Sequence, residues 1–143
     1  MRPALAVSAV IGLVATTALA SRGPVNLVAT PAVKAALRAS FLKAHPKFVA
    51  AKVRGPLKGQ TYYGRYRGVE YALAVFSIPR LGTTDQPELF RRVRPAAWRD
   101  RGDTGGEVCP PWVPLPLLRL WGFVKSSYTV VKGKRAYCYV PRR

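Results

Sequence analysis

Four carboxylates in the second half of the chain are the groups best suited to acid–base chemistry. Asp85 and Glu88 are three residues apart, and so are Asp100 and Asp103. A hydrolase that uses two carboxylates needs them to face each other across a cleft, with the pKa of one raised. Ion pairing is the simpler expectation, because five arginines lie close by in the sequence: Arg91, Arg92, Arg94, Arg99 and Arg101. A small carboxylate-based hydrolase is therefore an alternative, and no catalytic residue is predicted.

His45 is the one histidine in the sequence. It directly precedes Pro46, and the residue before a proline is disfavoured in a helix. An imidazole at the C-terminus of a helix interacts favourably with the helix dipole. We therefore expect His45 to cap a helix and not to act in catalysis. Two cysteines and one distant histidine do not make a zinc site, so we predict no metal and no cofactor.

Residues 102–106, with the sequence GDTGG, differ by one residue from the GDSGG turn of trypsin-like serine peptidases. A nucleophile in that turn needs a histidine base, an aspartate that orients the base and an oxyanion hole. No peptidase motif surrounds His45, and the extra methyl group of Thr104 crowds the path of attack. Glycines permit tight reversal of the backbone. The stretch, with the RGD tripeptide at 101–103, is therefore predicted to be an irregular turn.

Positive charge mixed with tyrosine is the strongest surface feature of the sequence. The 143 residues include 24 Lys and Arg against 6 Asp and Glu, which gives a net charge of +18. Such a chain attracts polyanions, although a basic composition without a binding role is the alternative. We expect nine residues to form an anion-binding surface: Lys34, Arg38, Arg65, Arg67, Arg91, Arg92, Tyr62, Tyr63 and Tyr66.

The first twenty residues have the pattern of a secretory signal peptide. Met1 and Arg2 give a positive start, residues 3–20 carry no charge, and the segment ends in small residues suited to signal peptidase. An uncleaved membrane anchor is the alternative. We predict cleavage after about Ala20, a linker over residues 21–30, and one domain over residues 31–143. The mature protein would be secreted or retained in the periplasm or cell envelope.

Cys109 and Cys138 are the two cysteines of the chain. In an oxidising compartment they are expected to form a disulfide. The bond would close a loop of about thirty residues and stabilise the domain by roughly 3–4 kcal/mol.

The elements that must position these groups follow from capping and periodicity. Thr30 can cap a helix that begins at Pro31, and Val33, Leu37 and Phe41 repeat on one face. Residues 61–78 predict two strands joined at 67–68, the second one central because both of its faces are apolar. Residues 88–100 predict a hairpin around 94–97, with a short helix as the alternative.

Shorter elements complete the prediction. Residues 48–53 are expected to form a strand, residues 79–88 a loop, residues 115–121 a short helix, and residues 128–131 and 135–140 two further strands. This order indicates an α+β fold: an N-terminal amphipathic helix packed on an antiparallel sheet, with a short second helix and one disulfide.

The span from Tyr62 to Trp121 resembles a group of small exported bacterial proteins that carry no assigned activity. The resemblance implies secretion and a compact domain, and it lends no mechanism. It rests on Tyr63, Gly64, Phe76, Asp85, Pro87, Phe90, Trp98, Gly102 and Cys109.

Together these features predict an exported, non-enzymatic protein that binds anionic cell-envelope polymers or lipid headgroups through a basic and tyrosine-rich surface. Nucleic acid is not an expected partner, because no ribonucleoprotein, KH or helix-turn-helix pattern is present and export removes most such partners. A secreted protein–protein module, such as an inhibitor or adaptor, is the main alternative. A steep salt dependence of binding would indicate a polyanion rather than a protein partner.

Overall fold

The computed structural model describes residues 23–78, 82–83 and 86–142. The predicted signal peptide and Asp85 lie outside the described residues. The remainder is an α+β fold, as the sequence predicts, built on a five-stranded antiparallel sheet in the order β1-β2-β3-β6-β7. Its strands are β1 (Val25–Asn26), β2 (Thr61–Tyr66), β3 (Val69–Ala74), β6 (Glu88–Val93) and β7 (Arg99–Asp103).

The two predicted hairpins form the middle of this sheet, and β3 is its central strand. The turn between β2 and β3 has positive φ at Arg67 (48°) and Gly68 (77°), as a tight two-residue hairpin turn requires. In the β3–β6 pairing, Glu70 lies opposite Arg92 and Tyr71 lies opposite Arg91. Consecutive residues of a strand face opposite sides of the sheet, so Glu70 and Tyr71 point to different layers.

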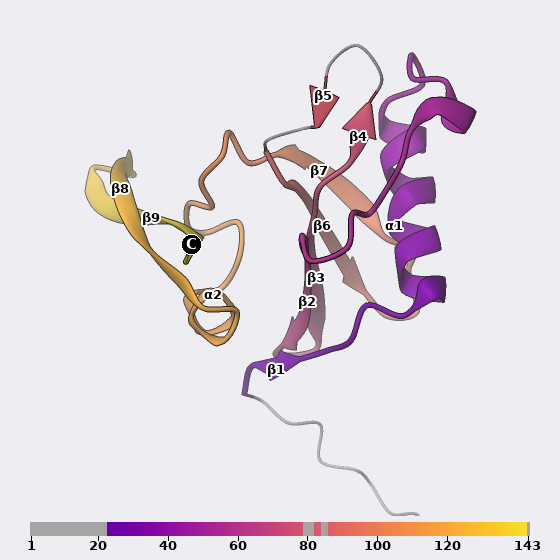
Figure 1. The fold of residues 1–143 in the computed structure, drawn as a ribbon. Coiled ribbons are helices and arrows are strands. Elements are labelled where there is room, and N and C mark those ends of the chain that lie inside the picture. Colours follow the sequence, from indigo (N-terminus) through magenta and orange to yellow (C-terminus); the bar gives the residue numbers. More distant parts are fainter. Residues whose placement is uncertain (1–22, 79–81, 84–85, 143) are drawn as a thin grey trace, which may run out of the picture.

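Helix α1 (Pro31–Ala44) covers one face of the sheet (Figure 1). The side chain of Thr30 accepts a hydrogen bond from the Val33 N–H at 3.3 Å and caps its first turn. Leu37 and Phe41 are completely buried, and the Phe41 ring stacks on Phe76 with ring centroids 4.3 Å apart. This apolar stripe fixes α1 on the sheet.

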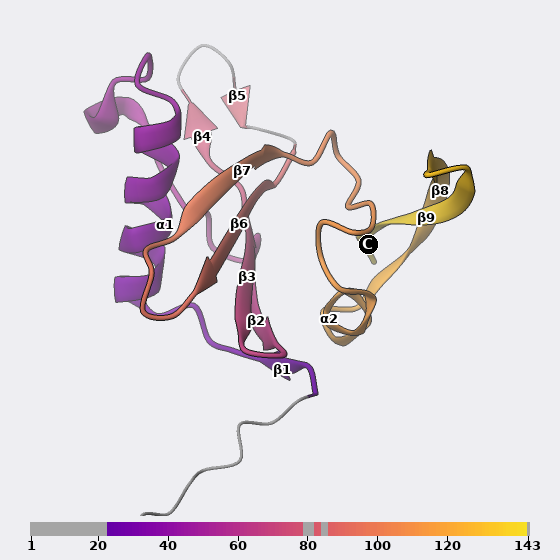
Figure 2. The same cartoon turned by 180° about the vertical axis from the view of Figure 1, so that it is seen from behind.

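The opposite face is covered by α2 (Leu115–Leu120) and by a hairpin of β8 (Phe123–Val131) and β9 (Lys134–Pro141) (Figure 2). These two strands form a separate two-stranded sheet. A second core lies between the layers and includes Leu73, Leu89, Leu117, Trp121 and Phe123. The sheet is thus buried on both faces.

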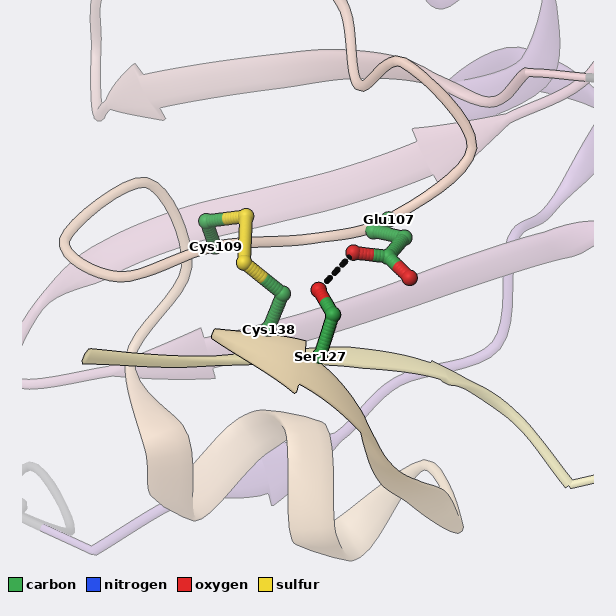
Figure 3. The surroundings of a disulfide bond; sticks show 4 residues. All are labelled: Glu107, Cys109, Ser127 and Cys138. Carbon is green, nitrogen blue, oxygen red and sulfur yellow. Dashed lines mark hydrogen bonds between the residues drawn. A yellow bond between two sulfur atoms is a disulfide. The ribbon is translucent and has the colours of Figure 1, made fainter. Parts of the chain in front are cut away.

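The Cys109–Cys138 disulfide is present, as the sequence predicts. It joins β9 to the loop that leads into α2, and Val108 pairs with Tyr139 beside it. Ser127 donates a hydrogen bond to Glu107 on the same side of the hairpin (Figure 3). The C-terminal hairpin is therefore held to the body by a covalent bond and a short β-bridge.

Three local predictions are wrong, and a fourth is wrong in part. The predicted linker at 21–30 contains β1, which pairs with β2 at the edge of the sheet. Residues 48–53 contain a single 3-10 turn, η1 (Ala50–Lys52), instead of a strand. The predicted loop at 79–88 contains β5 (Gly82–Thr83), which pairs with β4 (Ser77–Ile78). In the GDTGG stretch, β7 extends to Asp103, whereas residues 105–106 form the predicted turn, with positive φ at both glycines. No helix among the described residues is long and apolar enough to cross a membrane.

Candidate functional site

The nine predicted anion-binding residues do not form one surface. Tyr63 is buried and donates a hydrogen bond from its hydroxyl to Glu70 Oε2 at 2.9 Å. Arg92 Nε donates to the same oxygen at 2.5 Å, and Arg94 Nε donates to Glu70 Oε1 at 2.7 Å. Tyr63 and Arg92 therefore neutralise a buried carboxylate and are not available to a ligand.

The two predicted residues on α1 are half-buried. The Arg38 guanidinium donates to the carbonyl oxygens of Ala50 and Val53 at 2.5 Å and 3.1 Å. It thus ties η1 to α1. Lys34 lies one turn earlier on the same helix.

The remaining tyrosines serve mainly to pack α2 and β8 against the sheet. The Tyr62 ring lies 5.9 Å from Trp121 and 5.0 Å from Phe123, and Tyr66 packs against the same core. Arg65 is half-buried and Arg67 is exposed, with its guanidinium 5.2 Å from the Tyr66 ring.

Arg91, also exposed, lines a cleft of about 410 Å³ between the sheet and the loop after Cys109. Arg101 and Trp112 contribute to the same cleft, and so does Asp103. The Asp103 carboxylate accepts a hydrogen bond from the Gly105 N–H at 2.8 Å. The charges of this cleft therefore partly cancel, which weakens it as a site for an anionic surface.

A second basic and aromatic surface lies on the C-terminal hairpin, which the sequence prediction did not include. Lys132 and Gly133 have φ of 52° and 72° and form the two-residue turn that joins β8 to β9. The register places Tyr128 opposite Tyr137 and Val130 opposite Arg135. Directly opposed residues, and alternate residues along a strand, share one face.

This hairpin face, defined as Tyr128, Val130, Arg135 and Tyr137, is open to solvent. Tyr128, Val130 and Tyr137 are 56%, 64% and 44% exposed. The Arg135 guanidinium lies 4.3 Å from the Tyr128 ring, and Lys125 Nζ lies 4.2 Å from the Tyr137 ring. Each ring is therefore held beside a cation by a cation–π contact.

The candidate hydrolase carboxylates are brought together only in part. Glu88 and Asp100 meet beneath the C-terminus of α1, beside His45, whereas Asp103 faces the cleft described above. The side chains of Glu88 and Asp100 are 6% and 2% exposed. Burial and the nearby Asp100 and Asp103 charges raise the pKa of Glu88 to about 8, and burial also raises the pKa of Asp100.

His45 does cap α1, since its backbone N–H donates to the Phe41 carbonyl at 2.9 Å. Its side chain has a further position that the sequence analysis missed. Nε2 lies 3.5 Å from Asp100 Oδ2 and 3.9 Å from Glu88 Oε1. The pairing of β6 with β7 brings these acids together, and no local sequence pattern reveals it.

A sequence signal for the hairpin face did exist, because residues 128–137 alternate and carry a Lys-Gly turn. The alternation predicts two strands, but it does not show which of their side chains stay exposed.

No family model, no curated protein and no solved structure matches this chain.

Proposed function

We propose that this is an exported, non-enzymatic protein whose C-terminal hairpin binds anionic lipid headgroups at a membrane surface. The observation that carries the proposal is the exposed hairpin face, Tyr128, Val130, Arg135 and Tyr137, on a hairpin that extends away from the sheet opposite α1 (Figures 1 and 2). The disulfide is consistent with export, because such bonds persist in oxidising compartments.

The charge of the hairpin is complementary to an anionic bilayer. Residues 123–143 contain no Asp or Glu. Lys125, Lys132, Lys134 and Arg135 are all exposed on β8, β9 and their turn. A basic residue close to an anionic bilayer contributes about 1 kcal/mol to binding.

The apolar part of the face favours a lipid surface over a soluble polymer. Val130 is more exposed than either tyrosine of the face, and a phosphate or carboxylate polymer gains little from a valine. Tyrosine has an apolar ring and a polar hydroxyl, which suits the boundary between headgroups and acyl chains. Lys125 and Arg135 lie beside the two rings, where they can contact phosphate while the rings enter the interface.

The burial of the carboxylates supports a non-enzymatic role. Glu88 and Asp100 are the acids that approach each other, and both are covered by protein. A bulky substrate has no direct access to them.

Co-sedimentation with vesicles tests the proposal. We expect the mature chain to bind vesicles of phosphatidylglycerol and phosphatidylcholine and not vesicles of phosphatidylcholine alone. The double variant Lys134→Ala/Arg135→Ala should weaken binding about 10- to 30-fold, because it removes two cations from the hairpin. Its matched control is Lys43→Ala/Lys52→Ala, which removes the same charge from exposed positions on α1 and η1 and should weaken binding less than threefold.

The apolar contribution has its own matched pair. Val130→Ser should weaken vesicle binding, whereas Val28→Ser, at a valine that is 82% exposed near β1, should not. Equal losses in the two double variants would contradict the hairpin assignment. Binding of polyphosphate that is as tight as vesicle binding, and unaffected by Val130→Ser, would instead indicate a polymer ligand.

A further inference from the structure

The buried group of His45, Glu88 and Asp100 contains more polar atoms than its surroundings satisfy. His45 Nε2, Glu88 Oε2 and Asp100 Oδ2 are buried and have no hydrogen-bond partner among the described residues. Buried polar atoms are almost always paired, and each exception requires an explanation. Glu88 and Asp100 are both more than nine-tenths buried and point toward the same imidazole.

The spacing of the three groups has the size of a metal site. One nitrogen and one oxygen from each carboxylate all lie within 4.8 Å of one another. Ligand atoms at about 2.1 Å from a zinc ion, in tetrahedral geometry, lie roughly 3.4 Å apart. His45 Nε2 lies 3.5 Å from Asp100 Oδ2 and 3.9 Å from Glu88 Oε1, and both distances are close to this ligand–ligand separation.

Three different elements hold these ligands in place. His45 is fixed by the end of α1, and its ring packs against Phe41 with centroids 4.5 Å apart. Glu88 begins β6, and Asp100 lies in β7, where its Oδ1 accepts a hydrogen bond from the Gly102 N–H at 2.8 Å. That bond orients Asp100 so that Oδ2 faces the imidazole, in the manner of an outer-shell contact at a metal centre.

We propose that His45, Glu88 and Asp100 bind one divalent transition-metal ion, with Zn²⁺ the best match. An imidazole with two carboxylates is a nitrogen and oxygen donor set that suits zinc and neighbouring metals better than calcium. Three protein ligands leave one position for water. His45, with its side chain 28% exposed, is the most exposed of the three ligands, so the ion would enter beside its ring.

The charge of the group supports the proposal. Two carboxylates share a buried space with a single imidazole, so the group can carry more negative than positive charge. A divalent cation would balance that excess. The other group of potential ligands, Glu107 with Cys109 and Cys138, lacks free thiols because the disulfide uses them.

Calorimetric titration of the untagged mature chain with Zn²⁺ tests the site. We expect one Zn²⁺ per chain, and a loss of affinity of at least 30-fold in His45→Ala and in Asp100→Asn. The matched control is Glu107→Gln, which removes a carboxylate that lies outside this group and bonds Ser127, and it should leave the affinity within twofold of the wild type.

Spectroscopy of the wild-type chain tests metal binding without depending on whether the variants fold. Co²⁺ in a four-coordinate site gives intense visible absorption, and one equivalent should produce it. Addition of one equivalent of Zn²⁺ should also shift the NMR signal of His45 Nε2. The proposal is overturned if the wild-type chain takes up no Zn²⁺ at 1 mM, or if stoichiometric binding survives both His45→Ala and Asp100→Asn in folded protein.

Discussion

At the scale of the residue, Glu70 shows how this chain uses its few acids. Burial acts to raise the pKa of Glu70, but hydrogen bonds from Arg92, Tyr63 and Arg94 outweigh it, and the pKa lies below its ordinary value. An unpaired carboxylate in this position would be costly. Arg92 is further held by Trp98, whose ring lies 4.4 Å from the guanidinium. One acid thus fixes two strands and two arginines.

We predict that Glu70→Gln makes stability less dependent on pH in acid. A carboxylate whose pKa is lowered on folding adds stability above its unfolded pKa, and this stability is lost as pH falls through the folded pKa. The variant should therefore be about 2 kcal/mol less stable than wild type at pH 7, and the difference should shrink below pH 4. Urea unfolding at pH 7 and pH 3.5 measures it.

Glu107→Gln is the control for this experiment, because Glu107 contacts only a serine hydroxyl among the described hydrogen bonds. Its unfolding free energy should differ little from wild type at either pH. A difference for Glu70→Gln that stays constant between the two pH values would contradict the role given to the ionised carboxylate.

At the scale of the element, Gly64 allows α2 to approach the sheet. A Cβ atom at this position would lie 2.8 Å from Leu117 Cδ2, 2.9 Å from the Val25 carbonyl oxygen and 3.2 Å from Trp121 Cζ2. The requirement is for space alone, since φ at Gly64 is not in the positive region. The glycine is therefore needed for the contact between β2 and α2.

We expect Gly64→Ala to reduce the free energy of unfolding by about 1–3 kcal/mol through overpacking. Part of this loss should be recovered when the Leu117 side chain is shortened. The double variant Gly64→Ala/Leu117→Ala should be more stable than the sum of the single changes predicts, by at least about 0.5 kcal/mol. Additive single effects would show that α2 does not press on Gly64.

The sequence predicted individual elements better than their partners. Alternation identified the strands at 61–66, 69–74 and 88–93, because the two faces of each strand meet different environments. It did not reveal that β8 and β9 form a separate layer, since strand pairing depends on contacts between distant residues. Residues 48–53 were misassigned for a related reason: Arg38 of α1 holds the Ala50 and Val53 carbonyls in place of a neighbouring strand.

The candidate sites were less predictable than the fold. Periodicity correctly placed Tyr63 and Arg65 on the face opposite Tyr62, but it could not tell that Tyr63 satisfies Glu70. Similarly, His45 was correctly predicted as a cap, while its contact with Glu88 and Asp100 depends on where β6 and β7 meet α1. Side-chain function in this chain is decided by tertiary contacts.

At the scale of the whole molecule, the acids are placed where they compensate little of the surface charge. Glu70 is paired internally, and Glu88 and Asp100 are buried. The exposed basic residues of the C-terminal hairpin, together with Lys43 of α1 and Arg99 of β7, therefore face solvent largely uncompensated. Such self-repulsion opposes the compact state, so the domain depends on its two cores and on the disulfide.

The disulfide should therefore make a large contribution to stability. It links residues 29 apart, for which chain entropy gives roughly 3–4 kcal/mol. We predict that Cys109→Ala/Cys138→Ala lowers the free energy of unfolding by about this amount, and by more at low ionic strength, where repulsion is least screened. Guanidinium chloride adds salt of its own, so urea unfolding at 10 mM and 200 mM NaCl is the appropriate measurement.

Hydrogen exchange would locate the loss within the molecule. Without the disulfide, the β8–β9 hairpin is held to the loop by the two Val108–Tyr139 backbone hydrogen bonds, at 2.9 Å and 3.0 Å, and by the exposed Ser127–Glu107 hydrogen bond. The burial of Phe123 and Tyr139 adds to these contacts. Amides of β8 and β9 should then exchange through local opening of the hairpin, at a free energy below that of global unfolding. Amides of β2 and β3 should exchange only by global unfolding. Uniform acceleration of exchange across both sheets would mean that the hairpin and the five-stranded sheet unfold as one unit. In the urea experiment, a loss of unfolding free energy below about 1 kcal/mol would mean that the two cores suffice without the covalent link.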